Sequence, residues 1–382
     1  MRQDGSPVSN NPLSNNPVSN NPVSNNPFLS RPGAVDGTGT DAGVPAHYGN
    51  PMAEQRALAA GEAIVDLSHR AVLSVTGGDR LSWIDSLTSQ SIKSLQPGES
   101  SETLLLDPTG HLEYAVRLID DGVTLWLLLE REEATGLYTW LDRMRFMLRV
   151  EVADRTDEFA TIGTLGAPAI DPVAPNGVAL VWHDPWIAVS AGGHQYATTD
   201  EHPSAGWTYS EILVPRGTAS ALPAAGLLAL EALRIAAWRP RLATEADEKS
   251  IPHELDWLRS AVHLSKGCYR GQETVAKVHN LGHPPRRLVM LHLDGSDDVL
   301  PERSDEVFEG DKPVGTITSS ARHFELGPIA LAVVRRNTDP AATLLVHAGD
   351  ILVAAGQEIV VPPDAGAEAN VPRLPRLGAV RR

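Results

Sequence analysis

Apolar and polar positions alternate along most of this chain, but its first residues follow a different pattern. Residues 6–27 repeat Ser-Asn-Asn-Pro, with an apolar residue after each proline and a proline at every fifth position. Each proline removes a backbone donor, and the few apolar groups bury too little surface to offset the entropy of ordering. We therefore predict a disordered tail over residues 1–45.

Residues 46–155 show the periodicities of an α+β domain. Alternating apolar positions predict three antiparallel strands over 103–107, 111–119 and 123–129, joined by turns rich in Asp, Pro and Gly. Asp79 is placed to cap a helix whose apolar residues fall on one face. We expect residues 46–155 to form the N-terminal α+β domain of the chain.

Two more domains are predicted downstream. Residues 156–285 contain short strands separated by Pro and Gly, followed by a helix that Pro223 is expected to start. Residues 286–362 contain only strands and tight turns, a pattern typical of a small β-barrel. Residues 363–382 are rich in Pro, Ala and Arg and predict a second disordered tail. The expected fold class is therefore α+β, with three domains between two tails.

Charge and composition narrow the function classes. The net charge of −16 opposes broad binding to nucleic-acid phosphates, so no direct nucleic-acid partner is expected. No stretch approaches the roughly 20 apolar residues of a membrane helix, and the first residues do not resemble a secretory leader. We expect a cytoplasmic protein without a membrane partner.

Cys268 is the only cysteine of the chain, which excludes an internal disulfide and a zinc or cluster site built from cysteines of this chain alone. It lies between Lys266 and Arg270, two cations that favour a thiolate. We therefore select Cys268, with Lys266 and the adjacent Tyr269, as candidate catalytic residues. The alternative is a small buried apolar side chain, the common environment of a free cysteine.

The neighbours of this cysteine have predicted backbone roles. Gly267 and Gly271 allow sharp turns, and Gln272 and Glu273 are placed to hold the loop. The histidines nearby match no zinc spacing, so no metal site is expected. These histidines are His253, His263, His279 and His283.

The octapeptide Lys266-Gly-Cys-Tyr-Arg-Gly-Gln-Glu273 resembles the signature of the YgfZ-type folate-binding family, which is related to the glycine-cleavage T-protein, an aminomethyltransferase. The similarity covers about residues 47–361. Shorter stretches that support it are Val75-Thr-Gly-Gly-Asp79, Leu106-Asp-Pro-Thr-Gly110, Ala232-Leu-Arg-Ile235, Ile251-Pro-His-Glu254 and Val314-Gly-Thr-Ile-Thr-Ser-Ser320.

This resemblance implies a three-domain, cloverleaf aminomethyltransferase-like fold around a central channel that accepts tetrahydrofolate or a derivative. It also implies a role in the assembly or repair of iron–sulfur clusters. The implied partners are client proteins that receive iron–sulfur clusters, or proteins that assemble them. The implied role indirectly supports cluster enzymes such as those that modify tRNA. The residues that the resemblance assigns to cofactor binding are Arg234, Trp238, Glu254, Gly267, Gly271, Gln272 and Glu273.

Several positions depart from the aminomethyltransferase pattern. Tyr114 and Ala115 stand where the transferases carry acidic residues at the reactive folate nitrogen, and a methyl group cannot replace a general base or a charge partner. Glu113 points away from Tyr114 along a strand and is expected to be a surface carboxylate. Ala236 replaces a glutamate that reads the pterin ring, and Trp238 replaces a glycine.

The primary hypothesis is therefore a folate-binding accessory protein without classical turnover, in which Cys268 acts in iron–sulfur cluster maintenance. Two alternatives stay open. One is a folate-dependent aminomethyltransferase or other one-carbon transferase, and the other is an interaction scaffold that has lost folate.

Overall fold

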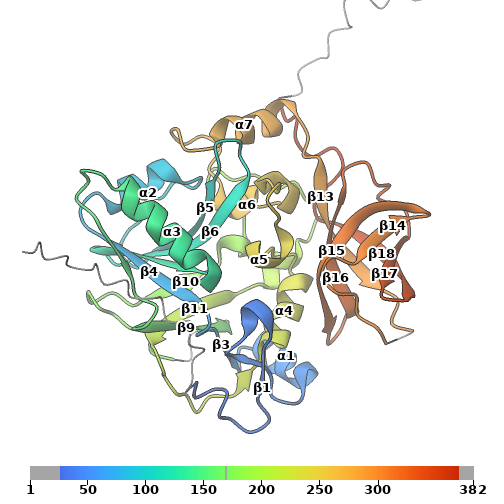
Figure 1. Ribbon diagram of the computed structural model, residues 1–382, viewed down its shortest axis with the longest axis horizontal. Coiled ribbons are helices and arrows are strands. Elements are labelled where there is room, and N and C mark those ends of the chain that lie inside the picture. Colours follow the sequence, from blue (N-terminus) through green and yellow to red (C-terminus); the bar gives the residue numbers. More distant parts are fainter. Residues whose placement is uncertain (1–25, 168–169, 297, 370–382) are drawn as a thin grey trace, which may run out of the picture.

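The computed structural model describes residues 26–167, 170–296 and 298–369, and it arranges them as three β-rich bodies around a common centre (Figure 1). This architecture confirms the predicted α+β class with a C-terminal barrel. Among the helices of these residues, none has both the length and the apolar character needed to cross a membrane.

The first body is an antiparallel sheet in the order β5-β6-β7-β4-β8. Its strands are β4 (Ala71–Thr76), β5 (Ser100–Leu106), β6 (Leu112–Asp120), β7 (Thr124–Leu129) and β8 (Glu151–Asp154). Two helices, α2 (Arg80–Leu87) and α3 (Arg131–Met144), cover one face of this sheet and contribute apolar side chains to a single core. The consecutive strands β5, β6 and β7 confirm the predicted three-stranded meander.

The second body is a sheet in the order β10-β11-β9-β3-β12. Its strands are β3 (Ile64–Asp66), β9 (Phe159–Leu165), β10 (Val181–His183), β11 (Tyr209–Pro215) and β12 (Ala224–Ala225). The helices α1 (Pro51–Ala59) and α4 (Leu227–Ala236) pack against each other beside it. Because β3 pairs with both β9 and β12, the boundary expected near residue 155 does not separate the two sheets.

The third body is a closed antiparallel barrel in the order β13-β16-β15-β14-β17-β18. Its strands are β13 (Arg286–Leu293), β14 (Glu306–Glu309), β15 (Lys312–His323), β16 (Gly327–Arg335), β17 (Leu344–Ala348) and β18 (Ile351–Ile359). A closed barrel leaves no free edge strand and encloses its own apolar core.

Short elements connect the bodies. They are β1 (Val35–Asp36), β2 (Pro45–His47), α5 (Leu242–Glu245), α6 (Leu258–Ala261), α7 (Gln272–Leu281) and the 3₁₀ helices η1 (Gly39–Asp41), η2 (Pro185–Ile187), η3 (Pro203–Gly206) and η4 (Pro252–Leu255). The largest apolar cluster joins all three bodies, with Leu104 and Trp126 from the first, Trp182 from the second, and Met290 and Leu331 from the barrel.

The prediction of disorder up to residue 45 is wrong for residues 26–45, which form β1, η1 and the start of β2. Phe28, at the end of the last repeat, is 2% exposed and packs in a cluster with Ile64 and Ile162. Asn26 donates from Nδ2 to Asp66 Oδ2 at 2.6 Å. An aromatic ring and a buried amide therefore supply the burial that the other repeats lack. Residues 1–25 lie outside the described residues.

The predicted C-terminal tail and two helix starts also differ from the structure. Residues 363–369 belong to the folded part, where Ala365 is 3% exposed, and residues 370–382 lie outside the described residues. Asp79 occupies the N-cap position of α2, but its carboxylate binds Arg149 instead of the helix backbone. The helix expected from Pro223 begins at Leu227, because the residues between them form β12.

Replacement of Phe28 by alanine is expected to lower the free energy of unfolding by about 3 kcal/mol, because a buried ring leaves a cavity. Urea denaturation of the full chain measures this value. The control is Val35→Ala in the same segment, where the side chain is 47% exposed and the change should stay within about 0.5 kcal/mol. Equal effects of the two substitutions would contradict the docked position of this segment.

Candidate functional site

The octapeptide forms a loop between α6 and α7 that is held against the first body. Lys266 donates from Nζ to the backbone carbonyls of Asp85 at 2.6 Å, Thr88 at 2.8 Å and Gln90 at 2.6 Å. These carbonyls lie at and beyond the C-terminal end of α2, where helix carbonyls lack partners within the helix. Burial lowers the pKa of Lys266, and the charge of Asp85 partly offsets this effect. The ammonium group is therefore bound to α2 and its following turn.

Arg270 is engaged in a second contact with the first body. Its guanidinium pairs with the Glu113 carboxylate at 2.7 Å and lies over the Trp140 ring at 5.8 Å from the centroid. Glu113, expected to be a surface carboxylate, thus fixes the octapeptide to β6. Both cations that flank Cys268 in the sequence bind groups other than the thiol.

Gly271 occupies a position that favours glycine, because of its backbone conformation and because it lies close to the β5–β6 turn. Its φ is +83°, and a Cβ atom would lie 2.8 Å from the carbonyl oxygen of Asp107. Gln272 donates from Nε2 to the carbonyl of Lys266 at 3.2 Å and so closes the loop. Gly267 has open space around the position of a Cβ atom, and Glu273 is exposed in the first turn of α7.

Cys268 is exposed on this loop, so the alternative of a buried apolar cysteine does not hold. Tyr269 next to it is 8% exposed, and burial raises its pKa. The tyrosine ring lines a small hollow with Gln272 and His279 of α7. The loop therefore presents a thiol to solvent from a backbone that is anchored on both sides.

A separate cavity of about 70 Å³ lies between the first and second bodies, next to α4 and the loop that follows it. Charged side chains dominate its wall: Arg70, Arg117, Arg234, Arg239, Arg241, Glu102, Glu130, Glu133, Asp184 and Glu231. Aromatic and apolar residues complete the wall, among them Ala115, Trp182 and Trp257. Of the described residues that line this cavity, none belongs to the octapeptide.

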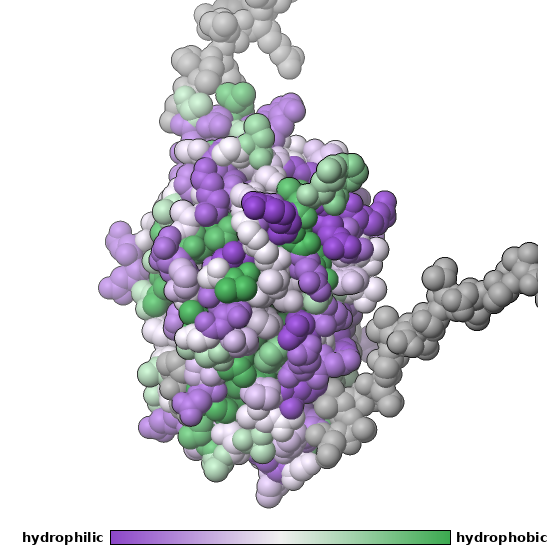
Figure 2. Space-filling view, turned by 90° about the vertical axis from the view of Figure 1, so that its left-hand side faces the viewer, coloured by the Kyte–Doolittle hydropathy of each residue, from purple (hydrophilic) through white to green (hydrophobic). Residues whose placement is uncertain are grey.

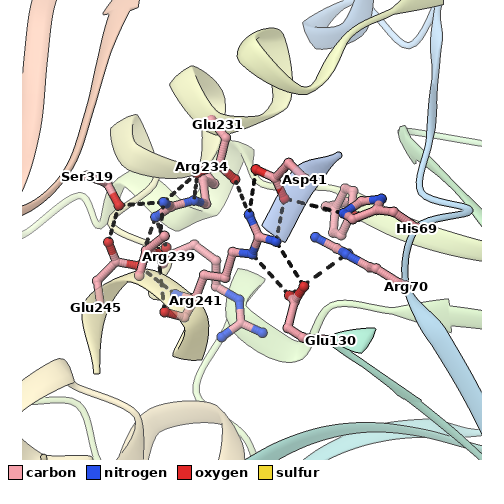
Figure 3. Close-up of polar contacts among 12 residues, drawn as sticks. Asp41, His69, Arg70, Glu130, Glu231, Arg234, Arg239, Arg241, Glu245 and Ser319 are labelled. Atoms are coloured by element: carbon pink, nitrogen blue, oxygen red, sulfur yellow. Dashed lines mark hydrogen bonds and ion pairs between the residues drawn. The ribbon is translucent and has the colours of Figure 1, made fainter. Parts of the chain in front are cut away.

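Each arginine of the wall is paired with carboxylates, as Figure 3 shows for part of the network. Arg241 binds Asp41 at 2.7 Å and Glu130 at 2.8 Å. Arg239 binds Glu102 at 2.6 Å and Asp184 at 2.9 Å. Such pairing is required because a buried charge without a partner costs several kcal/mol.

Some polar atoms of the wall are not satisfied. Among the described residues that line the cavity, Arg70 Nε, Arg239 Nη1, Trp257 Nε1 and Glu133 Oε2 are buried and have no hydrogen-bond partner. Burial and the nearby charge of Glu130 raise the pKa of Glu133 to about 8. At neutral pH this carboxyl group is mostly protonated and serves as donor or acceptor. The residues of the wall therefore hold three N–H donors and one carboxyl oxygen without a partner.

The residues expected to bind the cofactor lie in different places. Arg234 lines the cavity, but its guanidinium is bound to Glu231 and Glu245 and to Ser319 of the barrel, at 2.6 Å from the last (Figure 3). Glu254 is fully buried and binds Arg286 at 2.8 Å, so it joins η4 to the barrel. The other four, Gly267, Gly271, Gln272 and Glu273, belong to the octapeptide and do not line this cavity.

Trp238 occupies a backbone conformation that normally needs glycine. Its φ is +57°, in the left-handed region that favours glycine. The ring is 4% exposed, and its Nε1 atom lies 3.2 Å from the sulfur of Met290 in the barrel. Trp238 thus packs α4 against the barrel and is not part of the cavity wall.

The positions that depart from the transferase pattern are now placed. Ala115 lines the cavity, whereas Tyr114 faces the opposite side of the sheet, where its hydroxyl lies against Gly136 of α3. The acidic group expected there in a transferase is therefore replaced by a methyl group on the cavity side. Glu133 supplies a carboxyl group to the same wall from α3.

The four histidines around the octapeptide do not form a metal site. His253 is fully buried, and burial lowers its pKa to about 3. His279 accepts or donates a hydrogen bond with the Tyr196 hydroxyl at 3.1 Å and lies beside His194. Within the described residues, no group of three or more His, Cys, Asp or Glu side chains is arranged to hold a metal ion.

Sequence reasoning missed most of the cavity wall. Glu133, Arg117, Glu102 and Asp184 belong to four separate segments, and none lies in a recognisable motif. A weak signal was present at Arg239, because residues 234–241, at the end of α4 and in the loop after it, contain three arginines. The convergence of the wall residues depends on the packing of the first two bodies with α4 and this loop.

Comparisons with known proteins agree with this architecture. Residues 286–365 match the family model described as the glycine cleavage T-protein C-terminal barrel domain. A chloroplastic transferase of Arabidopsis thaliana is 26% identical over 319 residues, which cover 76% of this chain and 70% of that protein. An aminomethyltransferase of Prosthecochloris aestuarii is 23% identical over 320 residues, which cover 77% of this chain and 85% of that protein.

A solved structure has a similar fold. The crystal structure of the glycine cleavage system aminomethyltransferase T from Bartonella henselae matches with a TM-score of 0.66 and 16% identity, over 87% of this chain and 94% of that chain. Residues 286–365 are therefore similar to the C-terminal barrel of glycine cleavage T-proteins, and the chain as a whole is similar in fold to an aminomethyltransferase T.

Glu133 is expected to make stability depend on pH. Its pKa rises from about 4.3 in the unfolded chain to about 8 in the folded protein. Its stabilising contribution is present below the lower value and is lost as the pH rises through the higher one. Glu133→Gln should therefore gain roughly 1 kcal/mol or more relative to the wild type between pH 5 and pH 8.

Urea denaturation at both pH values measures this gain. Glu132→Gln is the matched control, because Glu132 is the exposed neighbour on the same turn of α3. A Glu133→Gln difference that is the same at pH 5 and pH 8 would show that the carboxyl group is ionised throughout.

Proposed function

We propose that this protein binds a reduced folate, with the pterin ring in the central cavity. We further propose that it acts as an accessory factor in iron–sulfur cluster assembly or repair, with Cys268 as its functional thiol. The observation that carries the proposal is the set of buried, unpartnered polar atoms in a cavity where Ala115 replaces a transferase carboxylate.

The polar atoms of the cavity suit a pterin edge. A pterin ring presents a carbonyl group, ring nitrogens and an amino group, which match the donors of Arg239 and Trp257 and the carboxyl group of Glu133. A cavity of about 70 Å³ holds several water molecules, so a ring must displace these waters and widen the wall. When bound, tetrahydrofolate carries one-carbon units on its ring nitrogens.

The wall does not favour the T-protein reaction. A carboxylate at the reactive nitrogen stabilises positive charge or moves a proton, and the methyl group of Ala115 does neither. Every arginine of the wall is neutralised by carboxylates, so the wall leaves no free cation for the negatively charged tail of a folate. The ring is therefore the part that this cavity recognises.

Cys268 supports the second half of the proposal. Its thiol is exposed, and the loop that carries it is anchored through Lys266 and Arg270. One thiolate supplies one of the three or four protein ligands that a cluster takes. Cys268 therefore acts on a cluster or sulfur atom that a client protein shares, and the cluster is substrate rather than resident cofactor.

A second candidate function is a folate-dependent aminomethyltransferase or related one-carbon transferase. It is supported by the names of the relatives in the comparison and by Glu133, which supplies a carboxyl group to the same wall from a different helix. A folate-free interaction scaffold is the third candidate.

Anaerobic calorimetric titration with tetrahydrofolate tests the folate half. We expect micromolar binding, about −8 kcal/mol, that weakens about tenfold in Glu133→Leu, because the leucine side chain has neither a donor nor an acceptor for the ring. Glu132→Leu is the control and should bind like the wild type. No binding by the wild type would favour the scaffold, and turnover of an aminomethyl donor would favour the transferase.

Cys268→Ser tests the thiol. In a host that lacks its own copy of this protein, the wild-type chain should restore the activity of iron–sulfur enzymes, and Cys268→Ser should not. The variant should still bind tetrahydrofolate, because Cys268 is not part of the cavity wall. Full restoration by Cys268→Ser would remove the role proposed for the thiol.

A further inference from the structure

The segment that joins α3 to β8 exposes an unusual set of apolar side chains. Phe146 is 88% exposed and Met147 is 86% exposed, and they are flanked by Met144 at 45% and Leu148 at 40%. Among the other described residues, exposed large apolar side chains lie far apart in the sequence, except for Ile187 and Val189, which are 41% and 46% exposed. We call residues 143–149 the apolar loop.

The side chains of the apolar loop do not contribute to the core beneath α3. The cluster beneath α3 takes Ala134, Leu137 and Leu141, with Tyr138 and Trp140 at its edge, and includes no residue of the apolar loop. Phe146 also has a φ of +40°, a backbone region that bulky residues rarely adopt. An exposed aromatic ring held in a costly conformation indicates a role outside the folded chain.

Basic residues surround the apolar groups. Arg143, Arg145 and Arg149 all lie within the apolar loop, in a chain whose net charge is −16. Arg149 pairs with Asp79 at 2.6 Å, yet its side chain stays 80% exposed, and Arg145 pairs with Asp142 while 42% exposed. Figure 2 views the side of the molecule on which α2 and α3 lie, and there apolar residues protrude beside strongly hydrophilic ones.

The apolar loop and the octapeptide contact opposite ends of α2. At one end of α2, Asp79 holds Arg149 of the apolar loop. At the other end, Asp85 and Thr88 hold Lys266 of the octapeptide. Since α2 has eight residues, its length of about 12 Å separates these contacts. On α3, Trp140 lies one turn before the last residue of the helix, and its ring contacts Arg270 of the octapeptide.

We propose that the apolar loop is the docking surface for a protein partner that presents an apolar pocket with an acidic rim, and that docking brings this partner to Cys268. The inference rests on the proposed function. Exposed Phe, Met and Arg side chains are enriched at the energetic centres of protein interfaces, and the charge of the arginines selects an acidic rim.

Two other occupants fit the surface less well. A symmetric contact with a second copy would place the three arginines against their own equivalents, which costs energy by like-charge repulsion. An anionic membrane is an extended surface that would meet more of a chain whose net charge is −16, whereas a protein partner meets only the apolar loop with its three arginines.

The test uses the full chain in the host that lacks its own copy, with iron–sulfur enzyme activity as the readout. The variants are the double substitution Phe146→Ser/Met147→Ser and the charge reversal Arg143→Glu/Arg145→Glu. The matched control is Val123→Ser/Leu352→Ser, which changes two residues that are 48% and 55% exposed on other parts of the surface. All variants should keep the wild-type free energy of unfolding and affinity for tetrahydrofolate.

We expect both loop variants to lower the restored enzyme activity about tenfold, and the control to match the wild type. Loss in Cys268→Ser with full activity in both loop variants would overturn the docking surface and leave the proposed function intact. Full activity in Cys268→Ser would instead overturn the function of the thiol.

Two direct measurements separate the other occupants. Co-sedimentation of the wild type with phosphatidylglycerol vesicles that is lost in Phe146→Ser/Met147→Ser would overturn the protein partner in favour of a membrane. A concentration-dependent dimer in analytical ultracentrifugation that the same variant abolishes would overturn it in favour of a second copy. A monomer that ignores vesicles, together with the loss of restored activity, supports the proposal.

Discussion

The buried arginine network is the constraint on which the rest of the structure depends. Arg234 connects α4 to the barrel, Arg239 connects the loop after α4 to the first and second bodies, and Arg241 reaches the N-terminal segment through Asp41 (Figure 3). Charges that are buried this deeply must be paired. Since the partners of these arginines lie on different bodies, the ion pairs form only when the bodies are packed together. The central cavity is what remains between these pairs.

The same network surrounds the position that differs from the transferase pattern. Ala115 on β6 lines the cavity beside Arg117 of the same strand, which is paired with Glu211. Glu133 brings a further carboxyl group to the wall from α3, close to Glu130 of the network. The site proposed for a folate ring is therefore enclosed by ion pairs between separate segments of the chain.

Much of the fold was predictable from the sequence because it rests on local patterns. The strands β5, β6 and β7 alternate clearly and are joined by turns with suitable residues, and the barrel strands follow the same rule. The docking of Phe28 was not predictable, since one aromatic residue distinguishes a buried repeat from otherwise identical ones. The octapeptide was found as a motif, yet the partners of Lys266 became visible only in the structure, because they lie far away in the chain.

The contact of Lys266 has a consequence for the order in which this protein folds during synthesis. The carbonyl of Asp85, near the end of α2, accepts a hydrogen bond from the ammonium group of Lys266, which is synthesised 181 residues later. Asp41 of the N-terminal segment likewise pairs with Arg241, which lies 200 residues later in the chain. Contacts of such long range are formed late and slowly. The first body therefore emerges from the ribosome before the residues of the octapeptide that complete its contacts.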